Sequence, residues 1–217
     1  MKIAATDVIN LLHSADHATL ATHSQQMPGY PYATVVPCIV GEAHRPIFLL
    51  SLLAEHTKNL LADGRCSLSV VQIDAGNVQT AARLSIVGDC ERFEPTPELV
   101  ARYLRYQPDA EQYLALDFVF LRMLPRRARF IGGVGHMGWL ESEDWHGFAQ
   151  VKLEDEADLL ASLPTPLSGD VQLLGVDCYG IDCLVGGQRI RKAFASTATS
   201  GDEVCALALR ALQAAHT

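Results

Sequence analysis

The sequence has no apolar stretch long enough to span a membrane and few basic residues, 17 against 25 acidic ones. A membrane-spanning helix needs about 20 apolar residues, and sequence-independent binding to nucleic acid or to an anionic membrane needs a basic surface. With a net charge of -8, neither kind of partner is expected. The first residues, Met1 to Asp7, also lack the charged segment and apolar run of a secretory leader, which predicts a cytoplasmic protein.

Motifs for metal binding, redox chemistry and hydrolysis are missing as well. The six cysteines form no Cys-x-x-Cys pair, and a chain of 217 residues is large enough to fold without disulfides. We interpret Cys38, Cys66, Cys90, Cys178, Cys183 and Cys205 as reduced core thiols. The eight histidines lack metal-ligand spacing, so no metal site is predicted. The Gly-x-Ser-x-Gly, Walker and His-Glu-x-x-His motifs are absent too, and no catalytic residue is assigned.

The residues that are present predict a folded core built mainly from strands. Apolar residues make up 49% of the chain, which is too many for a disordered protein. β-branched and apolar runs, separated by turns and by one short helix, predict an antiparallel sheet that curls into a barrel. The expected strands are 17–22, 32–40, 46–51, 65–73, 82–93 and a last strand or hairpin over 118–131.

The last third of the sequence has a different pattern. An acidic, irregular segment at 141–147 predicts a linker, followed by a helix over 150–163, strands over 171–185 and 189–194, and a final helix. We therefore expect an α+β protein with a barrel domain at residues 1–140 and a small helix-hairpin-helix domain at 148–217. Such a short domain is only marginally stable alone, so it should dock on the barrel.

Polar side chains gather where the expected strand 46–51 meets the short helix after it. Two hydroxyls, an imidazole and an ammonium surround a helix N-terminus whose first amides have no intrahelical partner, a combination that suits a phosphate monoester. Two further donors join them if their strands lie beside Ser51. In the alternative interpretation Thr57 only caps the helix, and His56 and Lys58 face water. The candidate ligands are Thr34, Ser51, His56, Thr57, Lys58 and Arg83.

A glycine-rich stretch, 133–138, follows the last expected barrel strand. Its spacing matches the glycine pattern of dinucleotide-binding folds. In those folds a helix opens within the motif, whereas residues 139–147 show no apolar helical stripe. We interpret the stretch as a strand-ending turn that needs positive φ angles.

Several of these segments together resemble a known family. The stretches 18–24, 29–31, 35–37, 51–60, 65–68, 130–135, 174–182 and 189–194 are similar to the pyridoxamine 5′-phosphate oxidase-like split barrel, in the branch of the HugZ and HutZ haem-utilisation proteins. The resemblance implies a homodimer with a cofactor site in each of two clefts between the subunits. In flavin-binding members FMN occupies this cleft, and its phosphate is held by basic and hydroxyl side chains. The resemblance places the six candidate ligands in this role.

The sequence departs from the family pattern at two places. Haem-degrading members open their second domain with a His-Met-Asn-x-Asp-His type stretch, and the comparable segment here, Val151 to Glu156, has neither histidine. The chain also lacks the arginine and histidine motif that ends true pyridoxamine phosphate oxidases. The leading hypothesis is therefore an FMN-binding, flavin-dependent oxidoreductase of unknown substrate. The alternatives are a haem-binding protein that uses another histidine, such as His23 or His136, and a cofactor-free module that binds a partner protein.

Overall fold

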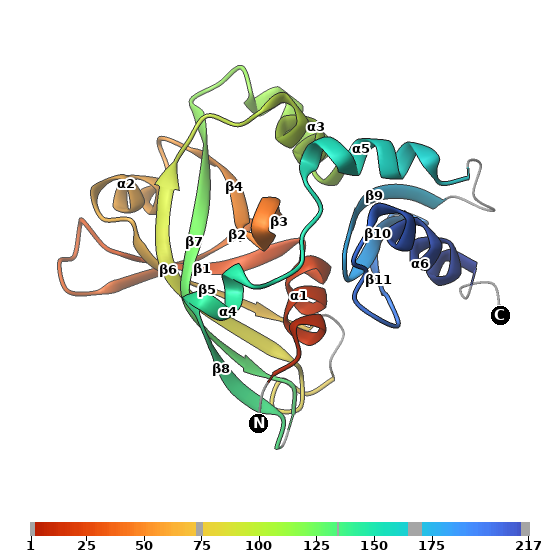
Figure 1. Cartoon of the computed structure of the whole chain (residues 1–217). Helices are drawn as coiled ribbons and strands as arrows, with labels where there is room; N and C mark the ends of the chain where they lie inside the picture. The colour runs from red at the N-terminus through yellow and green to blue at the C-terminus, as the bar shows by residue number, and fades with distance from the viewer. Residues whose placement is uncertain (1–2, 73–75, 134, 165–170, 214–217) are drawn as a thin grey trace.

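The computed structural model describes residues 3–72, 76–133, 135–164 and 171–213, and its main body is a curled antiparallel sheet (Figure 1). The strand order is β2-β1-β5-β6-β7-β4-β3, with β8 paired to β7. β2 approaches β4 across the gap and closes the barrel. The strands are β1 (His17–His23), β2 (Pro31–Pro37), β3 (Ile39–Val40), β4 (Pro46–Ser51), β5 (Arg65–Val71), β6 (Arg83–Arg92), β7 (Phe118–Ile131) and β8 (Met137–Glu141).

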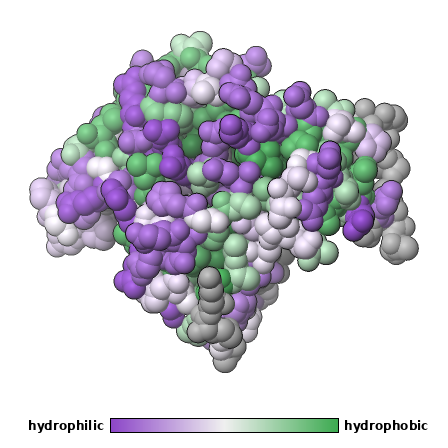
Figure 2. Space-filling view, viewed as in Figure 1, coloured by the Kyte–Doolittle hydropathy of each residue, from purple (hydrophilic) through white to green (hydrophobic). Residues whose placement is uncertain are grey.

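Alternating side chains along these strands fill the barrel. Leu20, Leu68 and Ile86 point inward and are fully buried, whereas Val87 on the outer face is 52% exposed. This two-residue period is the pattern that a sheet with one solvent-facing side requires. Figure 2 shows hydrophilic residues over much of the visible surface, with smaller apolar areas between them.

Short helices cover the ends of the barrel. They are α1 (Ala5–Ser14), η1 (Glu42–His44), α2 (Glu55–Ala62), α3 (Pro97–Tyr106), η2 (Pro108–Tyr113) and α4 (Ser142–His146). The Thr96 hydroxyl accepts a hydrogen bond from the amide of Leu99 and caps α3. None of the described helices is both long and apolar enough to cross a membrane.

The C-terminal unit, defined here as residues 148–213, is a three-stranded sheet with two helices. Its elements are α5 (Leu153–Ser162), β9 (Val171–Asp177), β10 (Gly180–Val185), β11 (Gln188–Ala193) and α6 (Gly201–Gln213). Ile181 and Cys183 on β10 pack with Val204 and Ala208 of α6 in one buried cluster. α1 contacts β11 and α3 contacts β9, so the unit docks on the barrel as expected (Figure 1). The chain is thus an α+β protein built on a split barrel.

Two local predictions were wrong. The acidic segment at 141–147 contains the short helix α4, because the carboxylates of Glu141 and Asp144 form a capping box at its start. The expected single strand over 171–185 is two strands, β9 and β10, and the amide of Tyr179 donates to the Asp177 carboxylate at 2.7 Å in the turn between them.

At the glycine stretch the expected positive φ angles are present, 119° at Gly133 and 80° at Gly135.

Candidate functional site

The junction between β4 and α2 has the open helix N-terminus that the sequence predicts. The residue before the helix, Ala54, gives no side-chain cap, so Thr57 is not the capping residue. The Ser51 hydroxyl instead accepts the amide of Leu53 at 3.1 Å, and the Ser51 carbonyl accepts the amide of Ala54 at 3.1 Å. The first amides of α2 are left without intrahelical partners, and their partial positive charge is directed at the space in front of the helix.

The Thr57 hydroxyl is the most unusual group at this junction. The side chain is 0% exposed, and its oxygen has no hydrogen-bond partner among the described residues. A buried hydroxyl without a partner costs roughly 1–3 kcal/mol. A ligand oxygen placed at the helix N-terminus would remove this cost by accepting the hydroxyl hydrogen.

Three charged or titratable side chains surround the same turn. His56 is half-buried, and this burial lowers its pKa, so its imidazole is a neutral donor or acceptor at neutral pH. Lys58 is exposed and carries a positive charge. Glu55 lies in the first turn and adds a carboxylate, which opposes an anion at this position.

α2 is fixed on the barrel by the side chain of Asn59. This fully buried amide donates to the Thr22 hydroxyl on β1 at 3.0 Å and accepts the amide of Gln25 at 2.9 Å. Both contacts hold the helix against the β1–β2 hairpin. The anion-binding groups at its N-terminus therefore stand on a rigid support, as a preorganised site requires.

The structure brings only one of the two additional donors near the junction. Thr34 is half-buried on β2, and β2 contacts both α2 and β4. Arg83 begins β6, where it pairs with Val71 and Ile131 and donates to the carbonyl of Val78 at 2.5 Å. Neither β2 nor β6 pairs with β4, so the condition that their strands lie directly beside Ser51 is not met.

The strand register places Arg83 away from the part of β6 that lies next to the end of α2. Asp89 pairs with Arg65, which follows α2 by three residues, and Arg83 lies six residues further along β6. At the rise of a strand, Arg83 and Asp89 are about 20 Å apart along β6. Within one chain, therefore, Ser51, His56, Thr57 and Lys58 lie at one junction, Thr34 lies on β2, which contacts α2 and β4 without pairing with β4, and Arg83 lies at the start of β6.

A second candidate site is a cavity of about 440 Å³ over β1, β5 and β6, close to the C-terminal end of α2. Its walls are mostly small or apolar side chains, and His23, Arg65 and Arg126 supply nitrogen atoms. Arg65 binds Asp63 at 2.6 Å and Arg126 binds Asp89 at 2.7 Å, which holds both guanidiniums in place. The complete lining is Ala21, Thr22, His23, Pro31, Arg65, Cys66, Ser67, Val87, Gly88, Asp89 and Arg126.

Sequence reasoning missed this cavity because its residues are spread over five strands, β1, β2, β5, β6 and β7. The sequence hinted at this cavity only through Ala21 on β1 and Ser67 on β5. Both are small residues at strand positions that alternate with buried ones. Small side chains on a solvent-facing sheet leave room above it. Register between strands, which decides that these positions meet, is a tertiary property.

Glu156 stands where the resemblance described above would place the last histidine of the haem-degrading members, and its carboxylate is already bound by other side chains. Glu156 on α5 is 2% exposed and binds the guanidinium of Arg102. Its Oε2 accepts from Arg105 at 2.7 Å, and its Oε1, which binds Arg102, also accepts from the amide of Val176 at 3.0 Å. Glu156 is therefore a structural residue and has no free oxygen for iron.

Comparison with known proteins identifies the fold family. The family model described as "CREG, beta-barrel" matches residues 3–147. The chain belongs to this family. The predicted resemblance to the split barrel is therefore confirmed, and the match covers the barrel together with α4.

Three other proteins are similar to this chain, one by sequence and two by structure. The chain is 31% identical over 130 residues to "Non-canonical heme oxygenase HOZ, chloroplastic" of Arabidopsis thaliana, which covers 59% of the chain and only 40% of that relative. A solved heme binding protein from Mycobacterium smegmatis has 24% identity and a TM-score of 0.61, over 100% of this chain and 99% of that one. A protein of unknown function from Agrobacterium tumefaciens has 24% identity and a TM-score of 0.72, over 97% and 94%. The two solved structures establish a shared fold that includes the C-terminal unit.

Proposed function

We propose that this CREG barrel protein binds FMN, with the flavin phosphate at the N-terminus of α2. The buried, unpartnered hydroxyl of Thr57 is the observation that carries the proposal. The exposed ammonium of Lys58 and the uncapped amides of the first turn supply the remaining attraction for a doubly charged phosphate. His56 and Ser51 belong to the same junction in the chain, and we include Thr34 because its strand, β2, contacts both α2 and β4.

The chemistry of the proposed site would come from the flavin, which supplies hydride and electron transfer when bound. The protein's own residues hold the phosphate and orient the ring. No catalytic side chain is assigned, and the substrate of such an oxidoreductase is left open.

The proposed active form is a homodimer that joins the outer faces of two barrels. Apolar side chains are exposed on several barrel strands, including Val35 on β2 at 63%, Val87 on β6 at 52% and Trp139 on β8 at 51%. Covering such side chains with a second copy removes apolar surface from water. Arg83, whose strand β6 does not pair with β4, would then act at the site of the second copy.

The test of FMN binding compares FMN with riboflavin, which has the same ring and no phosphate. Titration of the protein with each flavin, followed by quenching of flavin fluorescence, gives two dissociation constants. The double variant Thr57→Val with Lys58→Ala should weaken FMN binding by about 2–4 kcal/mol, a factor of roughly 30 to 1,000, and leave riboflavin unchanged.

Lys152→Ala, which removes an equally exposed ammonium beside α5, is the matched control and should bind FMN normally. Equal losses for both flavins would contradict the phosphate assignment. A protein that binds neither flavin would favour the alternative of a cofactor-free partner-binding module.

Haem binding is a second candidate, and the cavity beside His23 favours it. An apolar trough flanked by one imidazole and two guanidiniums suits a planar ring that carries carboxylates. The names of the Arabidopsis and Mycobacterium relatives also refer to haem. Titration with hemin should give a Soret band that His23→Ala shifts and His136→Ala does not, because His136 faces Asp7 at 3.3 Å on the β7–β8 turn. A band unaffected by His23→Ala would remove this site.

A further inference from the structure

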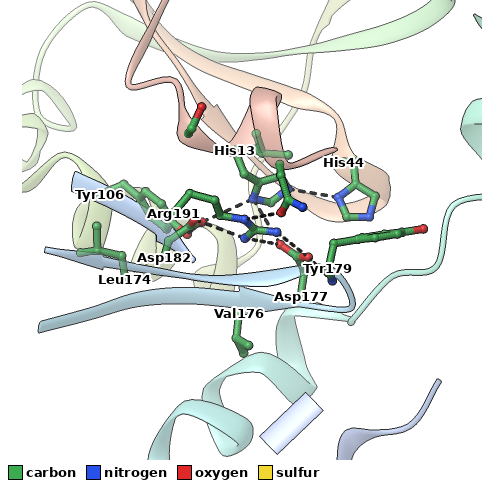
Figure 3. A network of polar contacts seen from close by, with 12 residues as sticks. His13, His44, Tyr106, Leu174, Val176, Asp177, Tyr179, Asp182 and Arg191 are labelled. Carbon is green, nitrogen blue, oxygen red and sulfur yellow. Dashed lines mark hydrogen bonds and ion pairs between the residues drawn. The ribbon is translucent and has the colours of Figure 1, made fainter. Parts of the chain in front are cut away.

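The barrel and the C-terminal unit meet at a buried cluster of ionisable side chains that the proposed cofactor sites do not use (Figure 3). Nδ1 of His13 on α1 faces the carboxylates of Asp177 on β9 at 3.3 Å and of Asp182 on β10 at 3.4 Å. Nε2 of the same ring lies 3.1 Å from Nδ1 of His44 on η1. All four residues are buried, so these groups must satisfy one another with little help from water.

The partners of the two imidazole rings fix how many hydrogens the rings carry. Nε2 of His44 lies 2.8 Å from the carbonyl oxygen of Ala149, which can only accept, so this nitrogen carries a hydrogen. The contact between the two rings needs a second hydrogen. The carboxylates in front of Nδ1 of His13 need a third, because an ionised carboxylate also only accepts. Two neutral rings supply only two hydrogens.

The third hydrogen does not belong to a carboxyl group, because other donors keep both carboxylates ionised. Arg191 on β11 donates to Asp177 at 2.8 Å and to Asp182 at 3.2 Å. The hydroxyl of Tyr106 donates to Asp182 at 2.6 Å. Burial alone would raise the pKa of each carboxyl, but the charge of Arg191 holds both below their usual range. One of the imidazole rings is therefore an imidazolium.

The charged ring is His13. Both of its nitrogens then donate, Nδ1 to the two carboxylates and Nε2 to Nδ1 of His44. Burial, and after it the neighbouring His13, lower the pKa of His44 to about 4, so His44 is neutral at pH 7 and keeps its hydrogen on Nε2. Two carboxylates, one guanidinium and one imidazolium leave this set of contacts without net charge, as buried charges require.

The pKa of His13 is subject to opposing effects, and its contacts decide between them. Burial alone lowers this pKa and Arg191 lowers it too, whereas Asp177 and Asp182 raise it. Among the described residues, both ring nitrogens contact only acceptors. A neutral ring would set a lone pair against a carboxylate or against the other ring, so the carboxylates prevail.

The guanidiniums near the ring are bound by other groups. Arg102 and Arg105 bind Glu156, and Arg189 lies 4.5 Å from the centre of the Tyr106 ring. The ionisable groups around His13 are Glu42 and His44 on η1, Arg102, Arg105 and Tyr106 on α3, Glu156 on α5, Asp177 on β9, Tyr179 in the turn after it, Asp182 on β10, and Arg189 and Arg191 on β11.

The turn that carries His44 fixes the acceptor for His13. Ala43 and His44 have φ angles of 53° and 52°, in the left-handed region that side chains other than glycine rarely adopt. Such residues persist where surrounding contacts impose them. The Trp145 indole donates to the carbonyl of Ala43 at 3.1 Å, and the His44 ring donates to Ala149. The segment that connects the two units therefore holds Nδ1 of His44 in position.

We propose that a proton on His13 holds the C-terminal unit on the barrel, and that the unit loosens when alkaline pH removes this proton. The imidazolium joins α1 to both β9 and β10. The closed joint binds the proton more tightly than a free imidazole does, whose pKa is about 6.5. Its contribution to stability is therefore complete below that pH and is lost as the pH rises through the pKa of the closed form.

Titration of the unchanged protein by ¹⁵N-histidine NMR tests the protonation itself. His13 should carry hydrogens on both nitrogens and reach half-titration above pH 6.5, and His44 should carry one hydrogen, on Nε2. The signals are assigned by their absence in His13→Gln and His44→Gln. Half-titration of His13 at or below pH 6.5 would overturn the proposal.

Hydrogen exchange of the α1 amides measures opening of the joint. Ile9 of α1 is fully buried in the apolar cluster of the C-terminal unit, so these amides are protected while the unit is docked. After correction for the intrinsic pH dependence, their exchange should rise above pH 6.5 by up to about tenfold per pH unit, the slope for one proton. Exchange that stays constant or falls between pH 6 and 9 would contradict the proposal.

Asp182→Asn is the decisive variant, because it removes the need for the proton. The Oδ2 atom of Asp182 faces both His13 and the Tyr106 hydroxyl. An amide nitrogen in its place can donate one hydrogen to Nδ1 of a neutral His13 and the other to the Tyr106 oxygen. The variant should remain docked at pH 6, and its α1 exchange should no longer depend on pH.

Two matched variants should keep the alkaline response. Asp158→Asn makes the same change at an exposed position of α5. His44→Gln can still donate to Ala149 and accept from His13, and it removes a ring that takes up no proton. A full alkaline response in folded Asp182→Asn, or its loss in His44→Gln, would overturn the assignment of the proton to His13. If Asp182→Asn does not fold, the NMR titration of the unchanged protein decides.

Discussion

The hydroxyl of Tyr106 donates a hydrogen bond to the carboxylate of Asp182 at 2.6 Å, and both side chains are buried. Tyr106 is the last residue of α3 in the barrel and Asp182 lies on β10 of the C-terminal unit, so this hydrogen bond joins the two units. Burial raises the pKa of Tyr106 well above its usual value, which keeps the hydroxyl protonated and able to donate.

Tyr106→Phe tests this contact directly. The variant keeps the buried ring but leaves Asp182 without one of its donors, so the free energy of unfolding should fall by about 1–3 kcal/mol. Denaturation by urea measures the change. Tyr113→Phe is the control, because the ring of Tyr113 stacks on Phe118 and the described residues offer its hydroxyl no hydrogen bond; a similar loss in that variant would show that the hydroxyl contact is not responsible.

Glu156→Gln should destabilise the protein far more than an ordinary surface change. The substitution leaves the buried guanidinium of Arg102 without its carboxylate, and breaking such a buried pair costs about 3–5 kcal/mol. Thermal unfolding followed by circular dichroism gives the size of the effect. Glu154→Gln, one exposed residue two positions earlier, should unfold like the unchanged protein; equal effects at both positions would mean that Glu156 contributes no more than surface charge.

Gly175→Ala should weaken the contact between α3 and β9, because the added methyl group has no room there. A Cβ atom at this position would lie 2.2 Å from the Tyr106 hydroxyl and 2.5 Å from an Arg102 nitrogen, so the ends of these buried side chains must shift and strain their hydrogen bonds to Asp182 and Glu156. Overpacking of this kind costs typically about 1–3 kcal/mol. Gly201→Ala, whose Cβ would meet only Leu159 at 3.4 Å, is the matched control, and the comparison of their urea midpoints checks the prediction. Equal midpoints would contradict the close approach.

Thiol labelling should single out Cys205. The other five cysteines are buried, and burial raises the pKa of Cys38 to about 12 and those of Cys178 and Cys183 to about 11. At pH 8 those thiols remain protonated and unreactive. Mass spectrometry after brief treatment with iodoacetamide should show one modified site in the folded protein and six after denaturation. Early modification of Cys38 would show that the barrel opens near β3.

Thr57→Val should stabilise the protein in the absence of a ligand. Valine has nearly the same shape and removes the hydroxyl that lacks a partner, so the free energy of unfolding should rise by about 1 kcal/mol. Thr22→Val is the opposite case, because the Thr22 hydroxyl accepts from Asn59, and it should lower stability. A loss of stability in Thr57→Val would mean that its hydroxyl already has a partner.

The barrel strands could be predicted from the sequence because the residues that specify each strand and turn are neighbours in the chain. β-branched runs such as Tyr32 to Val36 specify strands, and turn glycines such as Gly133 and Gly135 specify strand ends, without reference to distant residues. The four polar residues at the start of α2 were adjacent in the chain, so their grouping followed directly. The position of Arg83 did not, since it depends on which strands pair.

The buried cluster between the two units had almost no sequence signal. Arg191 binds Asn10 across 181 positions, and His13 reaches Asp182 across 169, so only the tertiary fold brings these residues together. Asp177 and Asp182 within an otherwise apolar stretch were the available hint, because carboxylates are almost never buried unless they are paired. Helix α4 was missed for a related reason: capping carboxylates and linker carboxylates look alike in a sequence.

The contacts between α1 and β11 also determine when the protein can finish folding during translation. Asn10 and His13 leave the ribosome among the first residues, whereas the β11 side chains that bind them leave almost 180 residues later. Throughout elongation the polar groups of the first helix lack their final partners, even when the barrel strands have already formed. The nascent protein therefore cannot form the contacts between α1 and β11 until the C-terminal hairpin has been translated. A message truncated before Gln188 would yield a barrel in which Asn10 and the carbonyl of His13 lack their arginine partners.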